Sequence, residues 1–464
     1  MGVAPCWADG KWRRNLRHPL DLRGAAAYFI GVALIEPSPL HPLLPDAFSR
    51  WFATRGWAPR VHQLALLEKA FEGRSTLLIA PTGAGKTLAG FLPTLVELGS
   101  PKPSRSKLVS TGRDVRQGEG LHTLYISPLK ALAVDIARNL ERPIADMKLP
   151  IRVETRTGDT PASRRQRQRR YPPDIMLTTP EQLALLLSSD DAPYMFASLK
   201  RIVLDELHAL VTSKRGDLLA LGLARLWTLA PQVTAVGLSA TVADPESLCR
   251  FLVPQKQDEV SAADLVIADA GAAPVVEMLD TRERLPWAGH AARHALHEIH
   301  DLVKANKTTL MFVNTRSQAE MLFQDLWRIN DDNLAIALHH GSLDVAQRRK
   351  VEDAMAAGKL RGVVCTSSLD LGIDWGDIDL VINVGAPKGA SRLMQRIGRA
   401  NHRLDEPSRA VMVPANRFEV LECRAAIDAV AENAQDTPPL RSGALDVLAQ
   451  HVLGRACGEP FLAN

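Results

Sequence analysis

Cysteine is scarce in this sequence, and the few cysteines are widely spaced. Five occur among 464 residues, and no two of them form a CxxC pair: Cys6, Cys249, Cys365, Cys423 and Cys457. Their odd number and wide separation argue against a disulfide framework and against a zinc site. This content fits a reducing compartment, so we expect a cytoplasmic protein.

The sequence also lacks a strong excess of charge of one sign. Its formal net charge is only +4, so any binding of nucleic acid depends on local basic patches and not on a global field. One candidate patch is a run of arginines: Arg164, Arg165, Arg167, Arg169 and Arg170. The run could line the path of a bound strand or form a solvated helix face, and the sequence favours neither.

Long apolar segments are missing as well. The stretch Gly24–Ile35 is too short to cross a membrane as a helix. Basic residues precede it, which imitates a signal peptide; they include Lys11, Arg13, Arg14 and Arg17. No internal repeat is evident, and 46% apolar with 23% charged residues suits a globular protein of two or three domains. We interpret residues 1–40 as an irregular N-terminal extension.

The most informative motif that is present is APTGAGKT (Ala80–Thr87). The apolar run Leu77–Ile79 before it predicts a buried strand, and a helical pattern follows it. Glycines in such a turn let backbone N–H groups face phosphate oxygens, and the helix N-terminus favours an anion. Lys86 would reach the β- and γ-phosphates of ATP, and Thr87 would bind Mg²⁺. Because Ala80 replaces the usual first glycine, an ordinary strand-to-helix turn is the alternative.

A second motif, DELH (Asp205–His208), follows the apolar run Arg201–Leu204 directly. A carboxylate at the carboxyl end of a strand faces the crevice where ligands bind in open α/β sheets. Asp205 is therefore placed to hold Mg²⁺, and Glu206 is placed to orient and deprotonate the attacking water. A solvated acidic strand end is the alternative, and the upstream Lys86 favours the catalytic interpretation.

A third motif, QRIGRA (Gln395–Ala400), lies much further along the chain. Arg396 and Arg399 are three residues apart, so a helix would place both on one face. An arginine brought in from another domain stabilises charge on the γ-phosphate and contributes about 10³–10⁵ in rate. A basic surface helix is the alternative. The three motifs predict an ATP-driven motor with these catalytic residues: Lys86, Asp205, Glu206, Arg396 and Arg399.

With these motifs in order, the chain resembles a superfamily 2 helicase from about Leu44 to Gly458. Six further motifs carry the resemblance: SPLKAL (127–132), TGD (157–159), TTPE (178–181), SAT (239–241), MFVNTR (311–316) and TSSLDLGID (366–374). HHGSLD (339–344), QRIGRANHR (395–403) and PANRFEVLECRAA (414–426) resemble the large helicase-related group, and within it the ligase-associated DEXH-box helicases of bacteria. Gln395 and His402 replace a His and an Arg of DEAD-box proteins, which argues against a DEAD-box RNA helicase.

Strand and helix patterns alternate, which predicts an α/β fold with parallel sheets covered by helices. By resemblance, they form two tandem RecA-like motor domains followed by the start of a winged-helix domain, whose first helix would carry Leu445, Leu448, Val452 and Leu453. We expect an extension over 1–40, an ATP-binding domain over 41–255, a connection that carries strands over 256–286, a C-terminal helicase domain over 287–430 and a truncated winged-helix start over 431–464.

The resemblance also implies further site residues. Phe48, Arg60 and Gln63 match the segment that recognises adenine, and the nucleotide is expected to contact Arg60, Gln63, Thr82, Gly83, Ala84, Gly85, Lys86, Thr87 and Asp374. Mg²⁺ is expected on Thr87 and Asp205. DNA is expected on Ser127, Lys130, Thr157, Thr179, Glu181, Thr315, Arg316 and Thr366. Coupling between the domains is expected through His208, Ser239, Thr241 and Gln395.

The predicted function is that of an ATP-dependent DNA helicase and translocase that moves 3′ to 5′ and serves DNA repair. Its expected partners are single-stranded DNA, tailed duplex DNA and, by resemblance, a DNA ligase and a nuclease. Two alternatives stay open. The protein could be an RNA helicase or remodeller, because the motor motifs do not record recognition of the 2′-hydroxyl. It could also be a DNA-binding fragment that truncation has left inactive.

Overall fold

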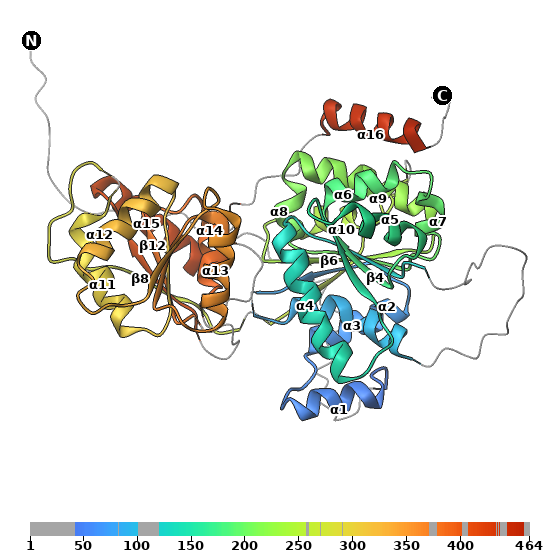
Figure 1. Ribbon diagram of the computed structural model, residues 1–464, viewed down its shortest axis with the longest axis horizontal. Coiled ribbons are helices and arrows are strands. Elements are labelled where there is room, and N and C mark those ends of the chain that lie inside the picture. Colours follow the sequence, from blue (N-terminus) through green and yellow to red (C-terminus); the bar gives the residue numbers. More distant parts are fainter. Residues whose placement is uncertain are drawn as a thin grey trace, which may run out of the picture. The chain divides into compact units, whose positions relative to one another are not determined.

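The computed structural model describes residues 42–81, 83–100, 120–256, 259–269, 271–289, 291–370, 378–400, 407–432, 434, 436 and 443–458. The predicted N-terminal extension lies outside these residues. Within them, the chain forms two β-sheets with helices packed against both faces (Figure 1). The predicted α/β fold with two parallel-sheet domains is therefore confirmed.

The first sheet has seven strands in the order β3-β4-β2-β5-β6-β1-β7, and every neighbouring pair is parallel. The predicted runs Leu77–Ile79 and Arg201–Leu204 form β1 and β5, in which every residue is buried. Strands buried on both faces read as continuous apolar runs, which is why sequence alone located them. The strands are β1 (Thr76–Ile79), β2 (Thr123–Ile126), β3 (Val153–Arg156), β4 (Ile175–Thr178), β5 (Arg201–Leu204), β6 (Thr234–Ser239) and β7 (Asp264–Ile267).

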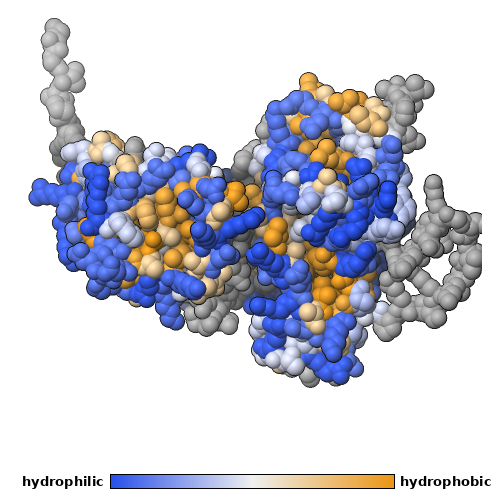
Figure 2. All heavy atoms as spheres, viewed as in Figure 1, coloured by the Kyte–Doolittle hydropathy of each residue, from blue (hydrophilic) through white to orange (hydrophobic). Residues whose placement is uncertain are grey.

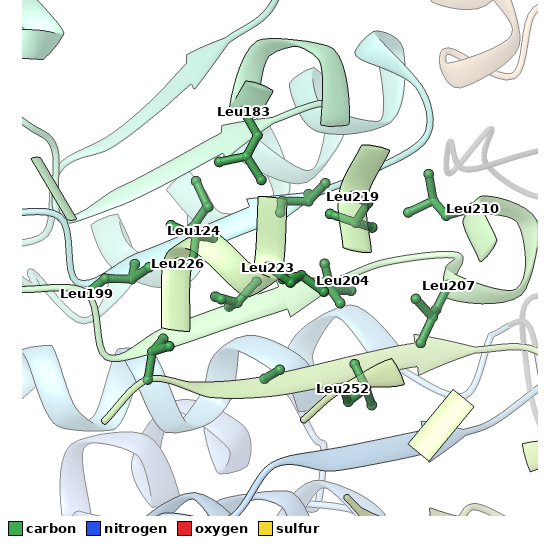
Figure 3. Packing of buried hydrophobic residues seen from close by; sticks show 14 of the residues in the cluster. Leu124, Leu183, Leu199, Leu204, Leu207, Leu210, Leu219, Leu223, Leu226 and Leu252 are labelled. Atoms are coloured by element: carbon green, nitrogen blue, oxygen red, sulfur yellow. The ribbon is translucent and has the colours of Figure 1, made fainter. Parts of the chain in front are cut away.

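Two hydrophobic cores lie on the two faces of this sheet, because successive strand side chains point to opposite sides. Along β2, Leu124 and Ile126 enter one core, whereas Tyr125 enters the other. Figure 3 shows the first core, in which leucines of α6 and α9 pack against leucines of the strands. The helices of this part are α1 (Asp46–Thr54), α2 (Val61–Phe71), α3 (Lys86–Gly99), α4 (Lys130–Asp146), α5 (Ala162–Arg170), α6 (Pro180–Leu187), α7 (Ala192–Phe196), α8 (Leu207–Val211), α9 (Lys214–Leu229) and α10 (Pro245–Phe251).

The second sheet has six strands in the order β10-β11-β9-β12-β13-β8, again all parallel. Its strands are β8 (Val275–Met278), β9 (Thr309–Phe312), β10 (Ile336–His339), β11 (Gly362–Cys365), β12 (Leu380–Val384) and β13 (Arg409–Val413). Its helices are η2 (Arg293–Ala295), α11 (Leu296–Ala305), α12 (Arg316–Arg328), α13 (Val345–Ala356), η3 (Ser367–Leu369), α14 (Ala390–Ile397) and α15 (Arg417–Ala431). Two further cores fill its faces.

The predicted connection 256–286 contributes a strand to each sheet. β7 pairs with β1 at the edge of the first sheet, and β8 pairs with β13 at the edge of the second. Both strands alternate between partly buried and exposed residues, as edge strands with one solvated face do. The connection is therefore built into both sheets at its strands.

The last helix described is α16 (Leu445–Gly458), which packs against α6 and α9. Lys214 at the start of α9 donates to Asp446 at 2.7 Å. Val447 is buried, whereas Leu445 and Leu453 are exposed. Figure 2 shows apolar residues on the surface where Figure 1 draws this helix. The predicted helix is present; its membership of a winged helix stays a prediction. Among the described helices, none is both long and apolar enough to cross a membrane.

Candidate active site

The candidate site lies at the carboxyl ends of four neighbouring strands, β2, β5, β6 and β1. The phosphate loop follows β1, DELH follows β5, and SAT begins at the end of β6. Register pairs Ile79 with Ser239 and Leu204 with Gly237, so these strands end at nearly the same level. Parallel strands thereby bring segments more than 100 residues apart to one edge of the sheet, where α/β proteins bind ligands.

The phosphate loop has the conformation that an anion site needs. Gly83 and Gly85 adopt left-handed backbone angles, with φ of 81° and 75°. Glycine adopts these angles without steric cost. Gly85 caps the N-terminus of α3, and Lys86 and Thr87 open the helix, where backbone N–H groups lack helical acceptors. The ammonium of Lys86 donates to the carbonyl of Ala80 at 3.0 Å, which holds it over the loop. Thr82 and Asp374 lie outside the described residues.

The N-cap residue and the first turn of α2 donate hydrogen bonds to three successive carbonyls of this loop. Arg60 donates to Gly83 at 3.3 Å, His62 to Ala84 at 2.9 Å, and Gln63 to Gly85 at 3.5 Å. Gln63 also accepts from the backbone N–H of Arg60 at 3.0 Å. Both predicted residues of this segment therefore reach the loop.

Sequence reasoning missed His62 and misplaced Phe48. Burial lowers the pKa of His62, so the neutral ring donates its Nε2–H to the loop. The only signal in the sequence was its position beside Gln63. Phe48 had been matched to adenine recognition, but its side chain is buried in the core beneath α3. That part of the prediction was wrong, because the ring faces the core.

Asp205, which is buried, and Glu206, which is partly buried, form an acidic pair after β5. Oδ1 of Asp205 accepts the N–H of Glu206 at 2.9 Å, and Oδ2 accepts the hydroxyl of Tyr125 at 2.6 Å. Burial and the neighbouring Glu206 raise the pKa of Asp205 to about 6. Burial also acts to raise the pKa of Glu206, but Lys86, His208 and Arg399 outweigh it and lower that pKa.

The backbone of Glu206 lies in the left-handed region, with φ of 48° and ψ of 44°. A non-glycine residue in this region costs on the order of 1 kcal/mol or more, and such residues cluster at functional sites. The turn carries the chain from β5 into α8 and directs the two successive carboxylates differently. Asp205 accepts a hydrogen bond from Tyr125, and Glu206 lies near the cationic side chains of Lys86 and Arg399.

Few protein groups here could bind a magnesium ion, which is usual where Mg²⁺ is bound together with a nucleotide. No cluster of three or more His, Cys, Asp and Glu that could hold a metal occurs in the described parts of the chain. The carboxylate of Asp205 and the hydroxyl of Thr87 have the oxygen chemistry that Mg²⁺ prefers, and phosphates and water would supply the remaining ligands. The residues therefore fit magnesium bound together with a triphosphate.

His208 connects the acidic pair to two other motifs. Its Nδ1 lies 3.2 Å from the hydroxyl of Ser239, and its Nε2 lies 3.0 Å from Nε2 of Gln395. Burial lowers the pKa of His208. Nδ1 also accepts the backbone N–H of Ala240 at 3.4 Å, and Nε2 also lies 3.5 Å from a carboxylate oxygen of Glu206. Three of the four predicted coupling residues meet; Thr241 lies two residues further on, partly buried.

The two arginines of QRIGRA have different surroundings. Arg396 is 1% exposed, donates to Asp370 at 3.0 Å and to Asn383, and lies 4.8 Å over the ring of Phe312. Arg399 lies close enough to Glu206 to lower its pKa. The prediction that both occupy one helical face was wrong, because α14 ends at Ile397 and Arg399 follows in a turn.

The predicted DNA residues of the first sheet lie after β2, β3 and β4, and ion pairs join their loops. Lys130 pairs with Asp159 at 3.1 Å. Arg215 pairs with Glu181 and donates to the carbonyl of Pro128 at 2.7 Å. Sequence reasoning missed Arg215, whose partners lie on other loops. These contacts therefore connect the segments that follow β2, β3 and β4.

Several predicted DNA contacts have hydroxyls engaged within the protein. Ser127 is buried and donates to the carbonyl of Leu129 at 2.9 Å. The hydroxyl of Thr157 accepts the N–H of Asp159, and Thr179 is buried at the start of α6. In the second sheet, Thr315 caps α12 by accepting from Gln318 at 3.2 Å. The remaining predicted residues are Arg316, which opens α12, and Thr366, which follows β11.

The arginine run forms α5 and holds the TGD loop. Arg164 and Arg167 pair with Glu154 of β3 at 3.3 and 2.9 Å. Arg165 donates to the carbonyls of Thr160 and Gly158 at 2.7 and 2.6 Å. These three arginines are engaged within the protein, so much of the run matches neither of the two alternatives, a solvated helix face or a basic surface for a bound strand.

Comparison with known proteins agrees with this arrangement. The chain matches the DEAD/DEAH box helicase family over residues 60–248 and the helicase conserved C-terminal domain over residues 291–403. It is 36% identical over 463 residues to a protein of Mycolicibacterium smegmatis named Lhr helicase/probable uracil glycosylase, covering 89% of this chain and 29% of that protein. It is also 36% identical over 443 residues to the ATP-dependent helicase Lhr-Core of Methanothermobacter thermautotrophicus, covering 91% and 49%.

A solved structure is similar as well. The structure of Mycobacterium smegmatis helicase Lhr bound to single-stranded DNA and AMP-PNP matches with a TM-score of 0.77 and 36% identity, covering 90% of this chain and 54% of that one. This chain spans half or less of the length of these two curated relatives. The chain therefore carries the two domains of a superfamily 2 helicase and is similar to Lhr helicases over 89–91% of its length.

Proposed function

We propose that this chain hydrolyses ATP to move along single-stranded DNA and to separate duplexes. The observation that carries the proposal is the setting of Glu206, whose carboxylate lies among Lys86 of the phosphate loop, His208 and Arg399 of the second sheet. One acidic group is thus in electrostatic reach of both helicase domains. The related Lhr structure, which contains single-stranded DNA and AMP-PNP, supports DNA as the nucleic acid.

In the proposed reaction, backbone N–H groups at the start of α3 and the ammonium of Lys86 bind the phosphates. Magnesium, held by Asp205 and Thr87, would neutralise charge on the β- and γ-phosphates. Glu206 orients a water molecule whose oxygen attacks the γ-phosphorus. The bond to the β-phosphate oxygen breaks, ADP leaves, and the water's proton passes to Glu206. Arg399 stabilises the charge that spreads over the γ-phosphoryl group.

On the DNA side, we propose that the joined loops after β2, β3 and β4 contact the phosphate backbone. Contacts to phosphates and sugars position a strand without reading its sequence, which suits a translocase. By family resemblance, we further propose movement from 3′ to 5′, a role in DNA repair and cooperation with a ligase and a nuclease, as in the ligase-associated bacterial group. A cytoplasmic location accords with these roles.

The test is ATP turnover with and without nucleic acid. Glu206→Gln should retain ATP binding but lose turnover by about 10²-fold or more, because the amide cannot accept the proton. Lys86→Ala should lose both. Glu246→Gln makes the same substitution at an exposed position of α10 and should behave like the wild type. Near wild-type turnover in Glu206→Gln would remove it from the mechanism.

Substrate and direction need separate assays. Single-stranded DNA should stimulate turnover more than RNA of the same sequence, and duplexes with a 3′ tail should be unwound in preference to those with a 5′ tail. Stronger stimulation by RNA would favour the alternative of an RNA helicase. Absence of turnover under every condition would favour an inactive DNA-binding fragment.

A further inference from the structure

One buried hydroxyl near the acidic pair has no part in the reaction as proposed above. Tyr125 lies in the middle of β2 and is 0% exposed. Its ring stacks on Phe91 of α3, with centroids 5.4 Å apart and planes at 28°. Its hydroxyl donates to Oδ2 of Asp205 across a distance of 2.6 Å. A tyrosine hydroxyl buried this deeply needs a partner, and here the partner is a carboxylate.

The bond completes a two-point attachment of Asp205. Oδ1 accepts the N–H of Glu206 at 2.9 Å, and Oδ2 accepts from Tyr125. The first donor belongs to the turn that follows β5, whereas the second belongs to the adjacent strand. A carboxylate with one donor on each oxygen cannot rotate about its terminal bond without losing both. The lone pairs that stay available therefore point in fixed directions.

The donor itself is rigid. β2 and β5 pair in parallel, with Tyr125 opposite Val203, and the ladder continues when Asp205 donates its N–H to Ile126 at 2.9 Å. The stacked Phe91 fixes the ring from the side of the core. A hydrogen bond from a neutral hydroxyl to a carboxylate is short and strong in such surroundings. The 2.6 Å distance lies in the range of such charge-assisted bonds.

We propose that Tyr125 is a positioning residue for magnesium: its hydroxyl holds Asp205 in the orientation that receives Mg²⁺ together with ATP. The inference rests on the proposed function, since it requires that Asp205 serves the metal. Partners that orient metal-binding groups typically contribute 10–100-fold to metal affinity. We expect a contribution of roughly tenfold, because the Glu206 N–H would still restrain one oxygen.

Tyr125→Phe tests the inference, since it removes the hydroxyl and keeps the ring. The readout is equilibrium binding of a fluorescent non-hydrolysable ATP analogue at a series of Mg²⁺ concentrations. The Mg²⁺ concentration for half-maximal enhancement of binding should rise roughly tenfold. Affinity in the presence of EDTA should change less than about twofold, because the phosphate loop is untouched. Each variant is measured well below its own unfolding temperature.

Two control variants separate the hydroxyl from packing. Phe196→Leu removes a buried ring from the core on the other face of the sheet and should lower the unfolding temperature without moving the Mg²⁺ dependence. Tyr194→Phe removes a hydroxyl from a half-exposed tyrosine of α7 and should change neither. In an Asp205→Asn background, Tyr125→Phe should add no further change in Mg²⁺ dependence, because the two residues act as one unit.

The outcomes are distinct. A lower unfolding temperature with an unchanged Mg²⁺ dependence in Tyr125→Phe would overturn the inference and leave a purely structural tyrosine. Additive effects of Tyr125→Phe and Asp205→Asn would also overturn it. If the wild type bound the analogue equally well with Mg²⁺ and with EDTA and hydrolysed no ATP, the proposed function itself would fail.

Discussion

Replacing Arg396 with alanine should unfold the second sheet more readily, although its motif suggests a catalytic arginine. The guanidinium is buried against Asp370, Asn383 and the face of Phe312. Asp370 is itself buried. Alanine would leave this carboxylate without its main partner, and breaking a buried ion pair from one side costs about 3–5 kcal/mol.

The structure places the expected value at the low end of that range. Arg392 lies 3.5 Å from the other oxygen of Asp370 and would keep part of its charge compensated. We therefore expect a loss of about 3 kcal/mol in the free energy of unfolding. For a domain of this size, that corresponds to a fall of roughly 6–12 °C in the unfolding midpoint.

The assay is thermal unfolding by circular dichroism, together with hydrogen exchange of peptides that cover β12 and β13. Arg392→Ala is the matched control, because it removes an arginine from the same carboxylate but from a more exposed position, and it should cost less than about 1 kcal/mol. If Arg396→Ala unfolded like the wild type and lost only ATP turnover, Arg396 would act at the nucleotide and the structural assignment would be refuted.

Three further predictions concern catalysis, pH and salt. Arg399→Ala should lower ATP turnover by about 10³-fold or more with little change in nucleotide affinity or stability, and a loss of affinity at full maximal rate would contradict the role proposed for it. Glu97→Gln should be destabilising at neutral pH, because His122, and with it Lys200 and Arg201, lowers the pKa of Glu97 when folded. Because the pKa of Glu97 is lower in the folded protein than in the unfolded chain, the charged carboxylate stabilises the fold above the unfolded pKa of about 4.5. This stabilisation is lost as the pH falls toward the pKa of the folded protein. The free energy of unfolding, measured in urea, should therefore differ between Glu97→Gln and the wild type by a constant amount from pH 8 to about pH 5, and the difference should shrink below the unfolded pKa. A difference that stayed constant down to pH 3 would contradict the ion pairs proposed for Glu97. The logarithm of the affinity for single-stranded DNA should fall linearly with the logarithm of salt concentration, whereas a flat response would argue against phosphate contacts.

Local sequence patterns located the strands and the motifs at their ends. Leu77–Ile79 and Arg201–Leu204 are buried on both faces, so their apolar runs mark them without knowledge of any partner. The glycines of the phosphate loop are required by backbone angles that the loop itself imposes. Such features depend on neighbours in the sequence, and sequence alone therefore predicts them.

Partners distant in the sequence were not predictable in the same way. Arg396 and Arg399 look equivalent in the motif, but the first meets Asp370 and Asn383 whereas the second follows the end of α14. Tyr125 looks like any aromatic residue of a buried strand, because its acceptor lies 80 residues further along. The arginines of α5 have acceptors on β3 and on the TGD loop. Each of these roles is fixed by tertiary contacts that no periodicity encodes.

The charges around Glu206 suggest when it becomes a base. A carboxylate with a lowered pKa accepts a proton poorly, and among its neighbours Lys86 lowers that pKa most. A bound triphosphate engages Lys86 and brings negative charge to the site, and both effects raise the pKa of Glu206. Arg399 acts in the opposite direction, so the second part of the chain, which carries Arg399, adjusts how basic Glu206 becomes. Phosphoryl transfer depends mostly on positioning and charge stabilisation. We therefore expect Glu206 to act first by orienting the water and to accept its proton only after ATP has changed the local field.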